Sequence, residues 1–188
     1  SPSTTLSFSY TVGAGQNTAD LDYASPNALA LNNATVIEAA APNRNASLDL
    51  AAPGAAGSLG ANKAIIIDTT APTTTVSTVT FSADTGATNT DLVTQTAAQT
   101  ISGTLSANLA AGEQVLVSLD NGATWSTATA MTGSNTWSLA GATLAGSNTL
   151  KARVQDAVGN AGTAVTRAYV LDTTPPAVPT VVTQPTVH

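Results

Sequence analysis

The sequence IDTTAP at residues 67–72 recurs as LDTTPP at residues 171–176, and the two copies lie 104 residues apart. This spacing is close to the length of an immunoglobulin-like β-sandwich, which has about 100 residues. Both copies combine Asp with Pro, residues that are typical of turns and connections. The repeated sequence therefore predicts tandem immunoglobulin-like units joined by a short linker.

The composition favours a folded β-chain. Only 9% of the residues are charged and 4% are aromatic, whereas 43% are hydrophobic. Disordered chains are poor in β-branched residues, but here Val, Ile and Thr recur in short alternating runs. Alternation with a period of two indicates strands, and no stretch has the period of an amphipathic helix. The predicted fold class is all-β, with tandem Greek-key sandwiches of which the first is incomplete.

The region between the two linkers contains about seven expected strands, enough for one complete sandwich. Six of them are assigned to residues 74–81, 99–109, 114–119, 136–139, 149–155 and 164–171, with a polar loop at 83–94 and a tight turn at 110–113. Asp120, Asn121 and Gly122 predict a hairpin turn, because Asn-Gly is the preferred pair for a two-residue connection. Trp125 and Trp137 are expected in the core rather than on a sugar-stacking surface.

These patterns divide the chain into four segments. Residues 1–67 are the C-terminal part of one sandwich, 68–73 a linker, 74–171 a complete sandwich, and 172–188 a linker with the start of the next repeat. The first segment offers five short strand candidates, at residues 5–12, 28–31, 35–38, 47–50 and 64–67. Because five strands are too few for this kind of sandwich, we expect its opening strands upstream of residue 1.

Four stretches carry a resemblance to a known family. They are the two linkers, SLDNGATW at 118–125, RVQDAVGNAG at 153–162 and YTVGAGQNTADLDYAS at 10–25. In this order and spacing they resemble the bacterial immunoglobulin-like repeats of giant surface adhesins exported by type I secretion, including RTX and biofilm-associated proteins. The resemblance implies a secreted protein at the bacterial cell surface whose repeats act as extenders in adhesion or biofilm formation. It also implies Ca²⁺ ions near the domain junctions, which stiffen the rod.

The distribution of acidic residues gives a second reason to expect calcium. Nine of the eleven acids are Asp, a common Ca²⁺ ligand in loops, and only five bases offset them. In a seven-stranded sandwich, alternate connections lie at opposite ends. The entry end should therefore gather Asp68, Glu113, Asp156 and Asn160, and the exit end Asp84, Asp91 and Asp172. Ca²⁺ takes six to eight oxygen ligands and would relieve the repulsion between these carboxylates.

Each candidate ligand also has an interpretation without metal. Asp68 and Asp172 fit the start of a turn, Asp84 and Asp91 fit ordinary loop positions, and Asp156 with Asn160 fits an Asx-type hairpin turn. Asp120 fits a turn residue better than a ligand. Asp20 and Asp22 would share one face of a strand and form a weaker ligand pair, or a solvated strand edge.

Several functions are disfavoured by the sequence. The net charge of −6 argues against nucleic-acid binding, which needs basic residues to neutralise phosphates. There is no Cys, and the single His is His188, so no Ser–His–Asp or Cys–His centre is available and catalysis with a small-molecule substrate is not expected. No apolar run is long enough to span a membrane. The expected partners are neighbouring repeats and calcium ions.

Two further functions stay open as alternatives. One is a β-sandwich module that binds carbohydrate or a host surface through its loops. The other is a surface-layer or phage-decoration domain that assembles by lateral contacts. Such an assembly would need an exposed apolar stripe, and the Thr-rich composition, low in aromatic residues, gives no clear sign of one.

Overall fold

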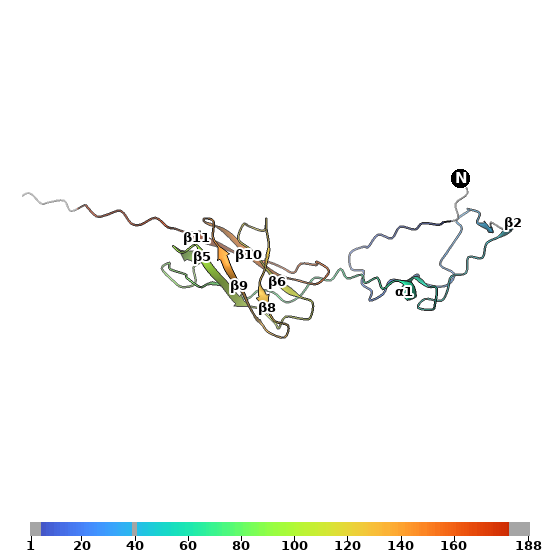
Figure 1. Cartoon of the computed structure of the whole chain (residues 1–188), viewed down its shortest axis with the longest axis horizontal. Helices are drawn as coiled ribbons and strands as arrows, with labels where there is room; N and C mark the ends of the chain where they lie inside the picture. Colours follow the sequence, from blue (N-terminus) through green and yellow to red (C-terminus); the bar gives the residue numbers. More distant parts are fainter. Residues whose placement is uncertain (1–4, 39–40, 181–188) are drawn as a thin grey trace, which may run out of the picture. The chain divides into compact units, whose positions relative to one another are not determined.

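The computed structural model describes residues 5–38 and 41–180 (Figure 1). The chain divides after Thr70 into two compact units, Ser1–Thr70 and Ala71–His188, which we call unit 1 and unit 2. The division falls within the predicted linker at residues 68–73. Residues 181–188, part of the predicted start of the next repeat, lie outside the described residues.

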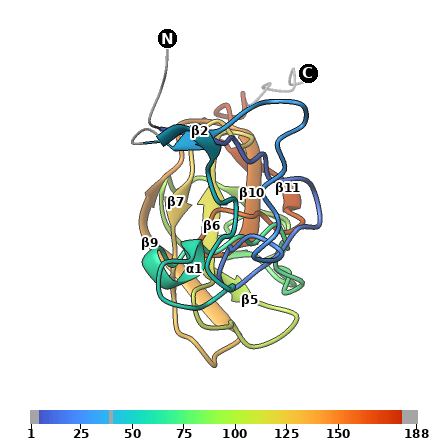
Figure 2. The ribbon, with the colours of Figure 1, turned by 90° about the vertical axis from the view of Figure 1, so that its right-hand side faces the viewer.

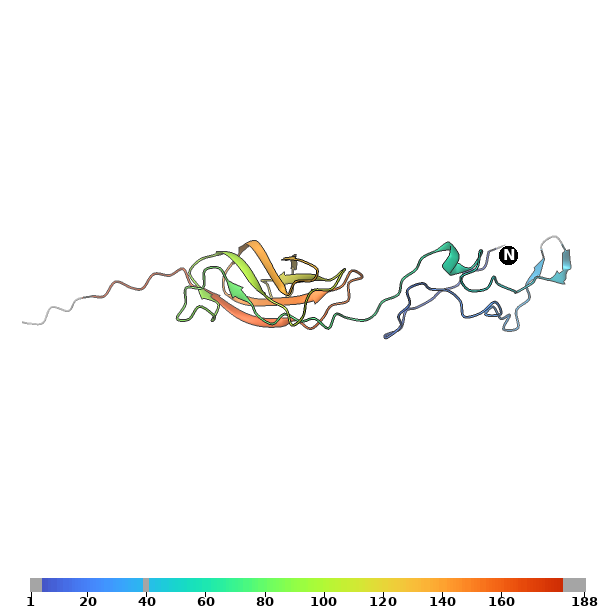
Figure 3. The same ribbon diagram turned by 90° about the horizontal axis from the view of Figure 1, so that it is seen from below.

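Unit 2 consists of two β-sheets that face each other (Figures 2 and 3). The five-stranded sheet has the order β4 (Val93–Thr94), β11 (Val165–Leu171), β10 (Asn148–Gln155), β6 (Gln114–Ser118) and β7 (Ser126–Thr127). The four-stranded sheet has the order β3 (Thr80–Phe81), β5 (Ala98–Thr104), β9 (Thr136–Thr143) and β8 (Thr129–Ala130). The expected all-β, immunoglobulin-like sandwich is confirmed in this unit.

The core of unit 2 forms where apolar residues of the two sheets meet. Val115 and Val117 of β6 are almost fully buried, as the alternation in QVLVSL predicts, and Leu150, Ala152 and Val154 of β10 are fully buried beside them. The connection from β6 to β7 is longer than the predicted two-residue loop, but it contains the expected turn. Its Asn121 and Gly122 have φ angles of 61° and 95°, the left-handed conformation that an Asn-Gly hairpin requires.

The two tryptophans have different environments. Trp137 on β9 is 3% exposed and belongs to the core, as predicted. The same prediction is wrong for Trp125, which is only half-buried and lies outside the core cluster. Its ring instead contacts the guanidinium of Arg153, with the Cζ atom 4.1 Å from the ring centroid. A tryptophan directly after a hairpin turn lies at the sheet surface, where a cationic side chain covers it.

The opening strand of unit 2 is shared between the two sheets. The predicted strand at residues 74–81 forms a ladder only at β3, together with an isolated bridge between Val76 and Leu105. The chain then crosses to the other sheet, where β4 pairs in parallel with β11. The end of the predicted loop at 83–94 is therefore a strand. The segment before β3 packs closely on the backbone at Gly103, where a Cβ would lie only 1.9 Å from the carbonyl oxygen of Thr78.

Unit 1 has little regular structure. It contains β1 (Ile37–Glu38) paired antiparallel with β2 (Ala41–Asn45), and a one-turn helix, α1 (Leu59–Asn62), whose N-cap is Ser58. The sequence did not predict α1.

Most strands expected in unit 1 are absent. The predictions at residues 5–12, 28–31 and 47–50 are wrong, since none of these ranges is in a strand. The range 35–38 forms only the short β1, and 64–67 contributes a single bridge between Thr18 and Ile67. The physical reason is that the described part of unit 1 provides no neighbouring strand to complete their ladders. Within this part, Ile67 and Ser58 alone are buried.

No helix in the part of the chain that the structure describes is long and apolar enough to cross a membrane.

Candidate functional site

The connection between β3 and β4, which we call the acidic loop (residues 84–92), brings Asp84 and Asp91 together. Asp84 Oδ2 accepts the backbone N–H of Leu92 at 3.0 Å. Asp91 accepts the N–H groups of Val93 and Thr88, each at 3.1 Å. The two carboxylates therefore accept from N–H groups of adjacent residues, Leu92 and Val93. This pair matches the exit-end grouping expected from the sequence.

One oxygen of the pair is left without a partner. Asp84 Oδ1 is enclosed by protein atoms, and no described residue donates a hydrogen bond to it. Burying an acceptor without a donor costs about 1–3 kcal/mol, and more for a charged group. A bound cation would remove this cost. Two carboxylates in one loop, one of them with an enclosed oxygen that accepts no hydrogen bond, are ligands of the kind that fits Ca²⁺, which binds through oxygen atoms.

The backbone of the acidic loop is strained next to this pair. Leu92 is fully buried and has a φ of 58°, a left-handed conformation that is unusual for a bulky side chain. A Cβ at Gly86 would lie 2.6 Å from Asp91 Oδ1, so only glycine leaves room for the carboxylate. Strained residues of this kind cluster at ligand sites.

Asp91 is ionised at neutral pH. The backbone N–H of Val93 lowers its pKa, partial burial opposes this effect, and the N–H of Thr88 lowers the pKa further. Arg167 reaches the acidic loop, but its guanidinium donates to the carbonyl of Thr90 at 3.5 Å. Among residues 5–38 and 41–180, no ion pair involves Asp84 or Asp91. The negative charge of the pair is thus not neutralised by a contacting base.

Asp172, the third residue expected at the exit end, lies further along the sheet. Its backbone N–H donates to the carbonyl of Thr94 at 2.9 Å, so it sits beyond the end of β4, whereas Asp91 precedes β4. Its Oδ1 accepts the N–H of Thr174 at 2.9 Å. The structure therefore places Asp172 at the same end of the sandwich as the acidic loop but does not bring it into the carboxylate pair.

The linker aspartates form the same turn in both units. Asp68 Oδ1 accepts the N–H of Thr70 at 2.9 Å, and Asp172 Oδ1 accepts the N–H of Thr174 at the same distance. This is the turn that their spacing before Thr-Thr-Pro suggests. Asp68 belongs to unit 1 and the other entry-end candidates to unit 2. Its approach to them stays a prediction.

At the entry end of unit 2, Asp156 is engaged by its own hairpin. Its Oδ1 accepts the N–H groups of Val158, Gly159 and Asn160, and its Oδ2 accepts the side-chain amide of Asn160 at 2.8 Å. Burial would raise the pKa of Asp156, but the hydrogen bonds, those of Asn160 first, outweigh it and lower the pKa. The geometry is that of an Asx-type turn, and it leaves this carboxylate poorly available to a metal.

Glu113 lies in the neighbouring turn, as expected. Its Oε2 accepts the N–H of Ala110 at 2.9 Å, and a Cβ on Gly112 would lie 3.5 Å from the Cβ of Ala157. The turn that carries Glu113 and the hairpin of Asp156 are therefore adjacent at the entry end.

Asp20 and Asp22 converge on one glycine of unit 1. A Cβ at Gly60 would lie 3.0 Å from Asp20 Oδ2 and 2.9 Å from Asp22 Oδ2. Burial would raise the pKa of Asp22, but N–H donors led by Gly54 outweigh it and lower the pKa. Asp20 accepts the N–H of Ile65 through its other oxygen. The weaker pair proposed from the sequence is thus a second place where two carboxylates meet.

No group of three or more His, Cys, Asp or Glu side chains that could hold a metal ion exists among the residues that the structure describes. A Ca²⁺ ion at either pair would therefore take most of its six to eight ligands from backbone carbonyls, hydroxyls and water.

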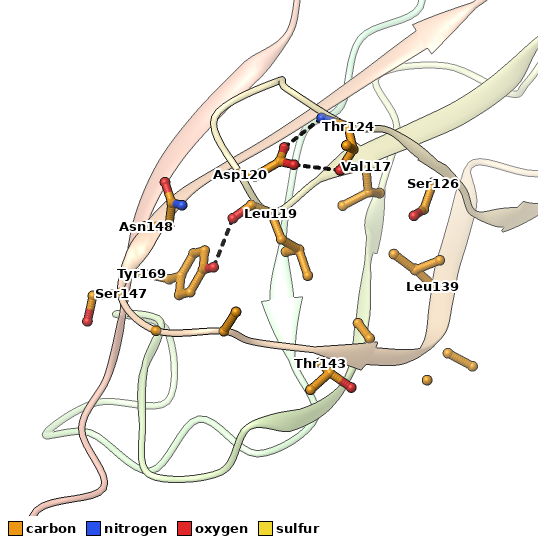
Figure 4. Close-up of a pocket in the computed structure, with 15 residues that line it drawn as sticks. Val117, Leu119, Asp120, Thr124, Ser126, Leu139, Thr143, Ser147, Asn148 and Tyr169 are labelled. Carbon is orange, nitrogen blue, oxygen red and sulfur yellow. Dashed lines mark hydrogen bonds between the residues drawn. The ribbon is translucent and has the colours of Figure 1, made fainter.

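A groove of 510 Å³ opens between the sheets beside Asp120 and was not anticipated from the sequence (Figure 4). Several of its polar groups form hydrogen bonds within the protein. Asp120 accepts the N–H and the hydroxyl of Thr124, and the hydroxyl of Tyr169 donates to the carbonyl of Leu119 at 2.9 Å. Hydrogen bonds, those of Thr124 first, lower the pKa of Asp120 to about 2. Asp120 is thus a turn residue, as expected.

Two facing, mostly antiparallel sheets whose acids lie in the end loops define an immunoglobulin-like structural module. The chain belongs to the bacterial Ig-like domain family, whose family model matches residues 69–173. A search of curated proteins finds no match to the chain. Domains of this family are typically non-catalytic structural modules and are usually extracellular or at the cell surface.

Proposed function

We propose that the chain is a non-catalytic spacer of a secreted bacterial cell-surface adhesin, in which Ig-like units follow one another and Ca²⁺ stiffens them. Membership of the bacterial Ig-like family supports the structural role. The repeated linker, with an identical turn at Asp68 and Asp172, supports the tandem arrangement.

The observation that carries the proposal is the path of the chain through unit 2. The chain enters beside the hairpin after β10, where a Cβ on Gly162 would lie 3.0 Å from the carbonyl oxygen of Pro72. It leaves beside the start of β10, where the N–H of Leu171 donates to Ser147 Oγ. Entry and exit are therefore separated by the length of β10, roughly 25 Å at about 3.3 Å per residue. A unit with this path extends the polypeptide, as a spacer requires.

We assign calcium first to the acidic loop at the exit end. Asp84 and Asp91 would hold the ion, with backbone carbonyls and water completing the shell. The enclosed Oδ1 of Asp84 supports this choice, as does the lack of a contacting base in the described part of the chain. Asp20 and Asp22 are the second candidate pair. Asp156 is a weaker candidate because four donors already occupy it.

Small-angle X-ray scattering of the whole chain with 10 mM Ca²⁺ and with EDTA tests the spacer role. We expect a longer and stiffer particle with calcium. Asp68→Ala should increase flexibility at the linker while the unfolding temperature of unit 2 is unchanged, and Asp49→Ala serves as a matched control in unit 1. A compact particle in both buffers would contradict the spacer role. Loss of unit 2 folding in Asp68→Ala would mean that Asp68 is structural.

The alternative function, carbohydrate binding, has less support. The groove between the sheets is lined by one aromatic ring, that of Tyr169, which packs edge-on against Phe81 at 5.9 Å and is not free to stack on a sugar. Binding of the chain to a glycan array would favour this alternative over the spacer.

A further inference from the structure

The Asn-Gly pair in the turn after β6 has a chemistry that the spacer function does not use. Asn121 is the only Asn followed by Gly in the sequence. Its side chain is exposed, and its carboxamide forms no hydrogen bond with another described residue. Because glycine has no side chain, the backbone nitrogen of Gly122 is open to close approach by that carboxamide. The electrophile of an intramolecular amide reaction is therefore free to move.

The reaction is deamidation, and it needs no reactant other than water. The nitrogen of Gly122 gives up its proton and attacks Cγ of Asn121, which closes a succinimide ring. The Cγ–Nδ2 bond breaks, and the side-chain amide leaves with that proton as ammonia. Water then opens the ring at Cγ, which gives aspartate, or at the backbone carbonyl, which gives isoaspartate. Because both reacting groups belong to neighbouring residues of one chain, the attack is far faster than a bimolecular one.

The attacking nitrogen, in contrast, is held in place. The N–H of Gly122 donates to Ser118 Oγ at 2.7 Å, and the hydroxyl of Ser118 donates to Asp120 Oδ1 at 2.7 Å. Ser118 is 1% exposed, so water does not compete for these bonds. Asp120 also accepts hydrogen bonds from Thr124, which makes its carboxylate a weak base toward the hydroxyl of Ser118. Since the nitrogen must lose its proton before it attacks, these hydrogen bonds raise the barrier.

We propose that Asn121 is a site of spontaneous deamidation and that the hydroxyl of Ser118 slows the reaction by holding the backbone nitrogen of Gly122. Loss of this hydrogen bond should speed the reaction about fivefold, since a typical hydrogen bond contributes about 1 kcal/mol. Deamidation would add a negative charge beside Asp120. Isoaspartate would also lengthen the backbone of a turn whose left-handed φ angles suit Asn-Gly. This inference depends neither on calcium nor on the spacer function.

Mass spectrometry after incubation of the whole chain at mildly alkaline pH measures the conversion of amide to acid in the peptide that contains Asn121. We expect the folded chain to react more slowly than the chain in urea, where Ser118 no longer holds the nitrogen. Ser118→Ala should speed the reaction of the folded chain about fivefold, whereas Ser118→Thr, which keeps the hydroxyl, should retain the slow rate. Thr124→Ala is the matched control, because it removes another hydrogen bond of Asp120 but leaves the bond from Gly122 to Ser118.

Amide hydrogen exchange separates this local effect from unfolding of unit 2. Ser118→Ala should speed exchange at Gly122 and leave the amides of β10 unchanged, because only a hydrogen bond of the turn is lost. Equal deamidation rates in the folded chain and in urea would overturn the proposal. So would a Ser118→Ala rate no faster than that of the wild-type chain, or no faster than those of Ser118→Thr and Thr124→Ala. Conversion that persists unchanged in Asn121→Ser would overturn the assignment of the site.

Discussion

The close backbone approach at Gly103 gives the sharpest stability prediction. In Gly103→Ala the new methyl group would lie 1.9 Å from the carbonyl oxygen of Thr78 and 2.8 Å from Trp137 Cζ2. Ordinary contact begins near 3.4 Å, so the segment before β3 must move by more than 1 Å. The hydrogen bonds that Ser77 and Thr78 donate to the carbonyl of Thr104 would then be weakened or lost.

The expected loss of stability combines two effects. Overpacking a well-packed core costs about 1–3 kcal/mol, and each lost hydrogen bond adds about 1 kcal/mol. We therefore expect Gly103→Ala to lower the free energy of unfolding of unit 2 by about 3–5 kcal/mol. For a unit of this size, the midpoint of thermal unfolding should fall by more than about 10 °C.

Chemical denaturation followed by the fluorescence of buried Trp137 measures this change. Gly133→Ala is the matched control, since no atom lies within 4 Å of its Cβ position and its φ is +81°. The control should lose only the cost of a left-handed alanine, about 1 kcal/mol. A loss for Gly103→Ala no larger than that of the control would refute the close-approach reasoning.

Three further outcomes are expected. Trp137→Ala should lower the free energy of unfolding by about 3–5 kcal/mol because it empties a core position. Trp125→Ala should lower it by only about 1 kcal/mol, the value of a surface cation–π contact. Denaturant titration of both variants measures the two losses. Hydrogen bonds, those of Thr124 first, lower the pKa of Asp120 to about 2, so the ionised carboxylate stabilises the folded state above the unfolded pKa near 4, and this contribution is lost as the pH falls from about 4 to about 2. In an acid titration of Asp120→Asn, the free energy of unfolding should therefore depend less on pH over this range. An unchanged pH profile would contradict the assignment. Asp156→Ala should speed amide hydrogen exchange at the N–H groups of its hairpin equally with and without calcium, because the carboxylate accepts hydrogen bonds from those groups. Faster exchange only with calcium would indicate that Asp156 is a metal ligand instead.

The sequence was informative where a local pattern and the tertiary structure agree. The period of two at Val115, Val117 and Leu119 predicts β6, although Leu116 between them is buried as well. Asn121-Gly122 predicts the turn after it, and both signals depend on neighbouring residues alone. The pattern failed where the partner strand decides the outcome. Residues 5–12 alternate just as well but form no strand, since no described segment pairs with them.

The candidate site was predictable only in part. Asp84 and Asp91 lie in one predicted loop, residues 83–94, so the sequence already places them near each other, while their role as metal ligands stays a prediction. Sequence alone does not reveal that one oxygen of Asp84 is enclosed without a donor, or that Leu92 adopts a left-handed backbone beside it, because both features depend on atomic packing. For Asp156 the sequence allows two interpretations, a metal ligand or the acceptor of an Asx-type turn. Hydrogen-bond geometry favours the metal-free one.

Thermal unfolding of the chain with 10 mM Ca²⁺ and with EDTA, compared with the Asp84→Asn/Asp91→Asn double variant, tests the calcium assignment most directly. Extracellular calcium modules bind at roughly 10⁻⁴–10⁻³ M, so 10 mM Ca²⁺ would stabilise a site at the tighter limit by about 2.7 kcal/mol. We predict that calcium raises the unfolding midpoint of unit 2 by roughly 10 °C, and that the double variant has the same midpoint in both buffers. Equal midpoints for the wild-type chain, or an equal calcium response in the double variant, would contradict calcium binding at the acidic loop.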